Sequence, residues 1–178
     1  MEKKILIGGF GRIGQSLIKR CLGFEMNVFV YDPYIEKDKI EAFGGYQVDD
    51  FKSAVKDMDI ISIHMPLNEK TKNLINLDLL KTMKKNCILI NTARGGIINE
   101  NDLSEALNKN YIFGAGLDVF NNEPPEKNNP LLKSNKVFLS PHTATFTEEC
   151  AERMGIETIQ NIIDFFDKKL EKFRTVIL

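Results

Sequence analysis

Cysteine is scarce in this sequence, with 3 in 178 residues. Cys21, Cys87 and Cys150 are odd in number and far apart, and each lies in an apolar stretch. This pattern argues against a disulfide framework and against a metal site built on cysteine. We expect the three side chains to be buried as small hydrophobic groups.

Long hydrophobic runs and an excess of one charge are also missing. No apolar segment approaches the roughly 20 residues of a membrane span, and the charged start Met1-Glu2-Lys3-Lys4 leads into a short apolar run rather than a signal peptide. The 24 basic and 25 acidic residues nearly cancel, which argues against nucleic-acid or anionic-membrane partners. The sequence therefore predicts a cytoplasmic protein that acts on small molecules.

Length and periodicity predict a single α/β domain over residues 1–178. At 43% hydrophobic, the chain can fill one core but not two. Short apolar runs alternate with amphipathic helical stretches, which is typical of a doubly wound, mostly parallel sheet with helices on both faces. The predicted strands cover 5–7, 28–31, 46–48, 59–63, 88–90, 113–119 and 137–139, and the predicted internal helices start near residues 12, 37, 51, 77 and 99.

The C-terminal part predicts a long loop followed by a long helix. Residues 121–136 are rich in Asn, Pro, Glu and Lys, and a loop of this length usually serves function or an interface. Thr145 and Glu148 have the spacing of a capping box that starts the final helix. The apolar face of that helix is expected to pack in the core; it comprises Ala151, Met154, Ile159, Ile162, Ile163 and Phe166.

A glycine-rich turn follows the first apolar run. Gly9, Gly11 and Gly14 form G-x-G-x-x-G between a predicted strand and a predicted helix, and Asp32 ends the second strand at about the 20-residue distance of a dinucleotide-binding unit. The glycines allow a tight turn, the approach of a pyrophosphate and close helix packing. The carboxylate of Asp32 can accept hydrogen bonds from the ribose hydroxyls of NAD, whereas it would repel the additional phosphate of NADP.

Polar side chains follow several of the predicted strands. In a sheet of this kind ligands bind beyond the carboxyl ends of the strands, and both histidines of the chain lie at such ends, where a proton donor is most useful. Each residue taken alone also has a structural reading: a satisfied polar histidine, an arginine that caps a helix or pairs on the surface, a solvated loop glutamate. The candidates are His64, Thr92, Arg94, Asp118, Glu123 and His142.

Six ordered motifs resemble one enzyme family. The segments GGFGRIG, VYDPY, HMPLNEKTKNLI, INTARGGIINENDL, GAGLDVFNNEPP and LSPHTA, spread between residues 5 and 166, are similar to the cofactor-binding domain of the D-isomer-specific 2-hydroxyacid dehydrogenases. This family includes 3-phosphoglycerate dehydrogenase and the hydroxypyruvate and glyoxylate reductases. The resemblance implies a Rossmann-type fold and NAD-dependent hydride transfer between a D-2-hydroxy acid and its 2-keto acid.

The resemblance also implies roles for individual residues. Arg94 would hold the substrate carboxylate and keto oxygen, His142 would donate the proton, and Glu123 would orient the imidazole. Asp118 would bind the nicotinamide carboxamide. The implied cofactor contacts as a whole are Gly9, Gly11, Arg12, Ile13, Gly14, Asp32, His64, Pro66, Thr71, Thr92, Ala93, Asp118 and His142.

The resemblance implies a second, substrate-binding domain in the relatives, which we expect this chain to lack. We expect the chain to be an excised domain, a truncated gene product or half of a split enzyme, and its activity alone stays open, as does the identity of its 2-hydroxy acid. The resemblance further implies a homodimer formed through this domain, with the loop 121–136 as a contact.

Two other functions stay open at this point. A non-catalytic NAD(H)-binding module, similar to the C-terminal-binding type of transcriptional corepressor, would use the same domain, although it would not need a proton donor. An unrelated Rossmann enzyme, such as a methyltransferase or a malate-type dehydrogenase, does not predict the order Arg94, Glu123, His142.

Overall fold

The structure is a computed structural model that describes residues 2–169. It divides the chain into two compact units, Met1–His142 and Thr143–Leu178. Every residue of the candidate site lies in the first unit.

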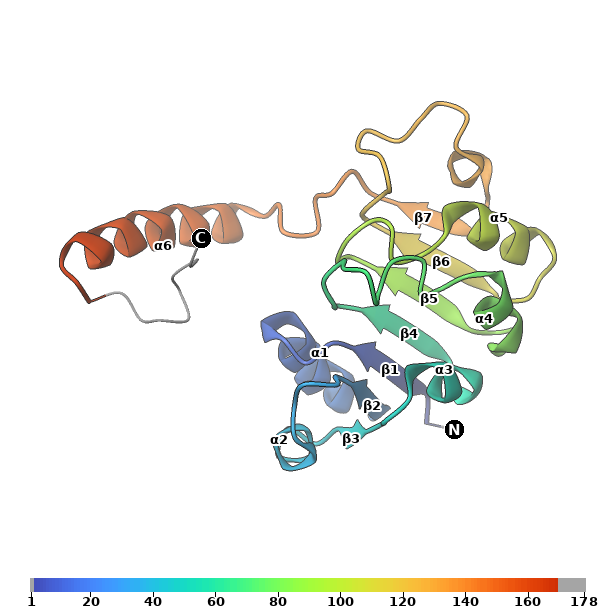
Figure 1. The fold of residues 1–178 in the computed structure, drawn as a ribbon, viewed down its shortest axis with the longest axis horizontal. Coiled ribbons are helices and arrows are strands. Elements are labelled where there is room, and N and C mark those ends of the chain that lie inside the picture. The colour runs from blue at the N-terminus through green and yellow to red at the C-terminus, as the bar shows by residue number, and fades with distance from the viewer. Residues whose placement is uncertain (1, 170–178) are drawn as a thin grey trace. The chain divides into compact units, whose positions relative to one another are not determined.

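The first unit is built on a parallel sheet of seven strands in the order β3-β2-β1-β4-β5-β6-β7 (Figure 1). This confirms the predicted α/β fold with a parallel, doubly wound sheet. The strands are β1 (Lys4–Gly8), β2 (Asn27–Tyr31), β3 (Tyr46–Gln47), β4 (Ile60–Ile63), β5 (Ile88–Asn91), β6 (Gly114–Leu117) and β7 (Val137–Leu139).

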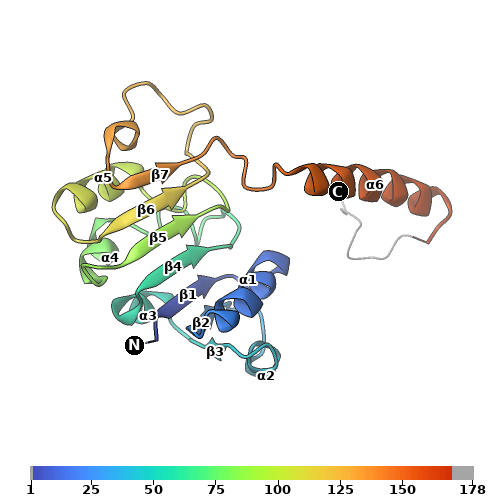
Figure 2. The same cartoon turned by 180° about the vertical axis from the view of Figure 1, so that it is seen from behind.

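Helices cover both faces of this sheet, as the opposite views in Figures 1 and 2 show. Because side chains alternate along a strand, Ile5 and Ile7 of β1 pack in one core cluster and Leu6 packs in the other. The cluster around Ile5 and Ile7 includes Ile18 and Ile40, from the first two helices. The five helices of this unit are α1 (Arg12–Gly23), α2 (Lys37–Glu41), α3 (Phe51–Ala54), α4 (Leu77–Thr82) and α5 (Glu100–Asn108).

The strand order reverses beside β1. The chain runs from β1 to β2 on one side and later returns to place β4 on the other side, with Gly8 paired to both Tyr31 and Ile63. A crevice opens at such a switch point, outside the carboxyl ends of the strands. The glycine turn begins at this point.

The start of the last helix differs from the prediction. Helix α6 (Glu148–Phe166) is capped by Thr147, whose Oγ1 accepts from the N–H of Cys150 at 3.2 Å, and not by Thr145. The reason is a turn over the preceding residues, in which Phe146 N–H donates to the carbonyl of Thr143. Described by itself, α6 has no buried residue, so the predicted core packing of its apolar face is not found within its unit.

The cysteines agree with the prediction in two of three cases. Cys21 and Cys87 are buried, whereas Cys150 in α6 is partly exposed. Burial raises the pKa of the Cys87 thiol to about 12, so this thiol stays protonated and unreactive at neutral pH. Among the described helices, none has the length and apolar character needed to cross a bilayer.

Asp59 ties together the amino-terminal ends of three strands. Its carboxylate accepts from the N–H of Lys4 at 2.9 Å and from the Lys84 ammonium at 3.2 Å, and these contacts lower the pKa of Asp59. A carboxyl group whose pKa is lower in the folded than in the unfolded protein stabilises the fold at pH values above its unfolded-state pKa. This contribution is lost as the pH falls through the folded-state pKa.

We therefore expect Asp59→Asn to lower the free energy of unfolding by about 1–2 kcal/mol at pH 7 and by much less at pH 3. Urea unfolding at the two pH values measures this difference. Asp57→Asn is the matched control, because Asp57 is exposed on the same connection. An equal loss at both pH values would contradict the electrostatic origin.

Candidate active site

The glycine turn joins β1 to α1 through a close backbone contact. Gly9 has a φ of +108°, a left-handed conformation that favours glycine. A Cβ at Gly14 would lie 2.1 Å from the carbonyl oxygen of Gly9, whereas a Cβ at Gly11 would meet nothing within 4 Å. Gly14 is thus required by packing, and Gly11 leaves open space in front of the first turn of α1, where backbone N–H groups favour an anion.

Asp32 is held at the end of β2 by two backbone donors. Oδ2 accepts from the N–H of Phe10 at 2.9 Å, and Oδ1 accepts from the N–H of Tyr34 at 3.0 Å. The first of these bonds links the carboxylate directly to the glycine turn. Each oxygen retains a lone pair, so the carboxylate can still accept from ribose hydroxyls.

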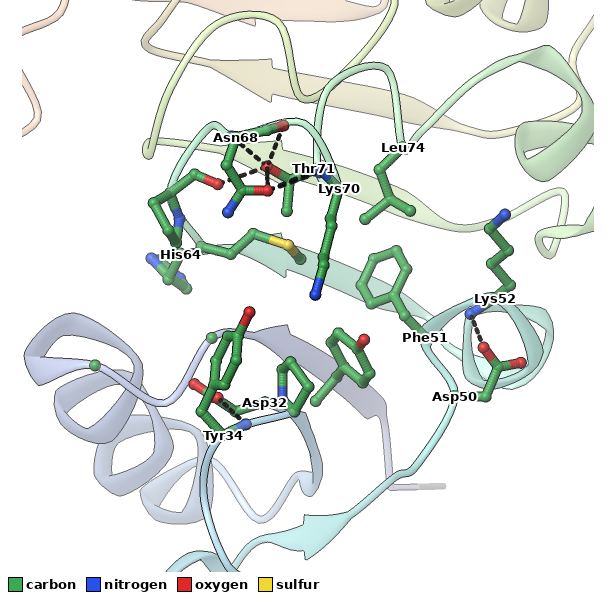
Figure 3. Close-up of a pocket in the computed structure, with 16 residues that line it drawn as sticks. Asp32, Tyr34, Asp50, Phe51, Lys52, His64, Asn68, Lys70, Thr71 and Leu74 are labelled. Carbon is green, nitrogen blue, oxygen red and sulfur yellow. Dashed lines mark hydrogen bonds between the residues drawn. The ribbon is translucent and has the colours of Figure 1, made fainter.

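A cavity of about 310 Å³ lies between the glycine turn, the end of β2 and the loop after β4 (Figure 3). Its lining combines the glycines and Asp32 with apolar side chains such as Phe51 and Leu74. This combination suits a nucleotide with a charged diphosphate and a flat base. The predicted cofactor residues among its lining are Gly9, Gly11, Asp32, His64, Pro66 and Thr71.

The loop after β4 is fixed by side-chain hydrogen bonds. Ser62, a buried residue of β4, bonds through Oγ to Nε2 of His64 at 2.8 Å. Thr71 Oγ1 donates to the carbonyl of Pro66 at 2.7 Å. Burial lowers the pKa of His64, which favours the neutral imidazole at pH 7.

A second hollow, of about 570 Å³, adjoins the first through His64 and Pro66. It contains Ile13, Thr92, Ala93 and Arg94. Ile13 is 59% exposed here.

Asn91 holds the loop that carries Arg94. Its buried amide accepts from the N–H of Ala93 at 3.0 Å and donates to the carbonyl of Arg94 at 2.9 Å. Gly95 presses the same loop against the next one, since a Cβ there would lie 1.8 Å from the carbonyl oxygen of Phe120. The position of Arg94 is therefore set by packing between the loops that follow β5 and β6.

Glu123 and His142, 19 residues apart, form a pair beyond the ends of β6 and β7. Glu123 Oε2 lies 2.7 Å from His142 Nδ1, and both side chains are partly exposed. Glu123 Oε1 accepts from the N–H of Phe120 at 3.1 Å. The hydrogen bond to His142 and, to a smaller extent, the one from the Phe120 N–H lower the pKa of Glu123. The carboxylate is therefore ionised at neutral pH.

Asp118 anchors the histidine loop. It is buried, and its carboxylate accepts from Ser140 Oγ at 2.5 Å, while its carbonyl accepts from the N–H of His142 at 2.8 Å. His142 has a φ of +55°, which is uncommon outside glycine.

Arg12 lies outside both hollows, and Arg94 lines one of them without the Glu123–His142 pair. Arg12 is exposed at the start of α1 and lines neither of the two hollows. Arg94 donates from Nη1 to the carbonyl of Ala93 at 2.6 Å, and the hollow that it lines does not include Glu123 or His142. The carboxyl ends of β5, β6 and β7 are nevertheless consecutive along one edge of the sheet.

Known proteins are similar to this chain in sequence and in structure. Residues 1–144 match the family of the D-isomer specific 2-hydroxyacid dehydrogenase, NAD binding domain. The chain belongs to this family. Its cofactor is accordingly NAD, and the 2-hydroxyacid dehydrogenases act on small hydroxy or keto acids.

Individual relatives are longer than this chain. D-3-phosphoglycerate dehydrogenase of Methanocaldococcus jannaschii is 44% identical over 160 residues, which cover 90% of this chain and 30% of that protein. Glyoxylate reductase of Thermococcus litoralis is 43% identical over 163 residues, covering 92% and 49%. An NAD-complexed 2-hydroxyacid dehydrogenase of Lactobacillus delbrueckii ssp. bulgaricus superposes with a TM-score of 0.86 at 29% identity, covering 96% of this chain and 55% of that one. The chain thus spans half or less of these curated relatives.

Sequence reasoning missed the residues that hold the site in place. Ser62, Asn91 and Ser140 each bond to a predicted site residue or to its loop. Asn91 and Ser140 follow apolar strand residues directly, and that position was a usable signal. Ser62 lies inside a strand and has no local signature.

Proposed function

We propose that this chain is the NAD-binding, proton-transferring half of a D-2-hydroxyacid dehydrogenase, which interconverts a 2-keto acid and a D-2-hydroxy acid. The whole of residues 1–178 would act as the cofactor-binding domain. The observation that supports a catalytic role is the contact of 2.7 Å between Glu123 and His142 at the same edge of the sheet as the nucleotide cavity.

The Glu123–His142 contact supports Nε2 as the imidazole atom that would exchange the proton. An ionised carboxylate only accepts hydrogen bonds, so Nδ1 of His142 carries a hydrogen in both charge states. Nε2 is then the atom that gains or loses a proton. In the reducing direction, protonated Nε2 donates to the keto oxygen, and Glu123 stabilises the cationic imidazole before the transfer and keeps the ring in place after it.

Arg94 suits the substrate carboxylate. A guanidinium offers paired donors that match a carboxylate, and the rigid loop held by Asn91 presents it. The bond from Arg94 Nη1 to the neighbouring carbonyl would be exchanged for the substrate. When bound, NADH supplies the hydride to C2 of the keto acid, while the proton from His142 completes the hydroxyl group.

The chain spans half or less of the length of the two curated relatives named above, and we propose that activity requires a substrate domain, supplied as part of a longer chain or as a second polypeptide. That domain would close over the hollow lined by Ile13 and Arg94 and exclude water. We further propose a cytoplasmic location and a homodimer with the loop 121–136 as a contact. Light scattering at micromolar concentration tests the dimer.

A non-catalytic NAD(H)-binding module gains no support from the site. Nucleotide binding alone does not need the bond between His142 and Glu123.

The proposal is tested by NADH titration followed by turnover. The parent chain is expected to bind NADH, and to oxidise it with glyoxylate or hydroxypyruvate once the substrate domain of a relative such as the Thermococcus litoralis glyoxylate reductase is supplied. Tight NADH binding without oxidation in any combination would favour the non-catalytic module. No NADH binding would overturn the proposal.

A further inference from the structure

Lys70 reaches into the nucleotide cavity from the loop after β4. Figure 3 shows its side chain crossing the cavity, with the ammonium directed at the wall formed by Asp32 and Tyr34. Within the described part of the chain, this ammonium makes no hydrogen bond and no ion pair. The cavity therefore contains a cation with unused donors.

The backbone beneath Lys70 is fixed. Asn68 Oδ1 accepts from the N–H of Lys70 at 2.9 Å and from the N–H of Thr71 at 3.1 Å. Thr71 Oγ1 in turn accepts from the N–H of Asn68 at 2.8 Å and donates to Pro66. Because this turn is held by its own side chains, the direction in which Lys70 leaves the loop is set before any ligand binds.

The other charged side chains of the cavity do not duplicate Lys70. Asp50 caps α3 by accepting from the backbone N–H groups of Lys52 and Ser53. The ammonium of Lys52 points away from the cavity in Figure 3. Lys70 and Asp32 are thus left as the two charged groups that would face a nucleotide bound in the cavity, one on each wall.

Asp32 marks the position of the adenosine ribose, since a carboxylate at the end of the second strand accepts from the ribose hydroxyls. It would repel a phosphate on the 2′ oxygen, whereas an ammonium on the opposite wall would attract the same group. The discrimination between a 2′-hydroxyl and a 2′-phosphate therefore depends on both residues.

We propose that Lys70 is a specificity-determining residue of the cofactor pocket, which offsets Asp32 and allows the 2′-phosphorylated dinucleotide to bind as a weaker second cofactor. This inference rests on the proposed binding of a nicotinamide dinucleotide in this cavity. The donors of Lys70 would bond to the 2′-phosphate, and with NADH they would stay solvated.

The test compares Lys70→Gln with Lys72→Gln. Lys72 lies on the same loop, is exposed and does not line the cavity, so it controls for the general loss of one positive charge. We expect Lys70→Gln to weaken NADPH binding about tenfold and NADH binding less than about twofold, because a charge-assisted bond is lost from only one complex. Lys72→Gln should change neither Kd by more than about twofold. NADPH binding by the parent should also fall more steeply with salt than NADPH binding by Lys70→Gln.

Three results would overturn this inference while leaving NADH binding intact: an equal loss for both dinucleotides, the same effect from Lys72→Gln, or no binding of NADPH by the parent up to roughly 1 mM. Absence of NADH binding by the parent overturns the proposed function itself, so the two failures are distinguishable.

Discussion

Replacing His142 with alanine is expected to lower kcat for keto acid reduction by about 10²–10⁴, because the reaction loses its general acid. The measurement is NADH oxidation by the chain combined with a substrate domain. The expected loss depends on the bond between Nδ1 and Glu123, which leaves Nε2 as the atom that donates the proton.

Two comparisons separate chemistry from structure in this prediction. Glu123→Gln keeps a hydrogen-bonding side chain but removes the charge, and should cost about 10–100-fold in kcat, as is usual for a group that orients another. The Kd for NADH should stay within about twofold in both variants, since neither residue lines the nucleotide cavity. Unchanged turnover in His142→Ala would show that the proton comes from another group.

The substitutions Gly14→Ala and Gly11→Ala are expected to impair different properties, stability in the first variant and NADH affinity in the second. The Cβ at residue 14 would lie 2.1 Å from a backbone oxygen, so Gly14→Ala should lose about 3 kcal/mol or more of unfolding free energy and melt roughly 10 °C lower. Gly11→Ala has room in the empty site and should melt within a few degrees of the parent. Its methyl group would occupy the approach of the diphosphate, so NADH affinity should fall about 100-fold.

Thermal unfolding and NADH titration check both halves of this comparison. Gly23→Ala is the control, because its Cβ would also meet nothing within 4 Å and it lies at the far end of α1. A stable Gly14→Ala variant would show that the turn can rearrange. Normal NADH affinity in Gly11→Ala would place the diphosphate elsewhere.

Much of the predicted nucleotide-binding part of the site could be derived from the sequence, because its residues lie close together along the chain. A strand, a glycine turn and a helix follow one another within residues 4–23, and Asp32 ends the adjacent strand. Parallel pairing brings the ends of neighbouring strands to one edge, so residues after apolar runs were sound candidates.

The sequence by itself determined four features of this protein: the alternation of strands and helices, the glycine turn, its acidic partner and the two histidines at strand ends. These features depend on side-chain period and on short spacings, which act within a few residues. Only the tertiary structure decided that His142 bonds to Glu123, that Asn91 holds the arginine loop, that Thr147 rather than Thr145 caps α6, and that Lys70 faces Asp32. Those outcomes depend on how loops from different strands pack against one another, and no local pattern of residues specifies that packing.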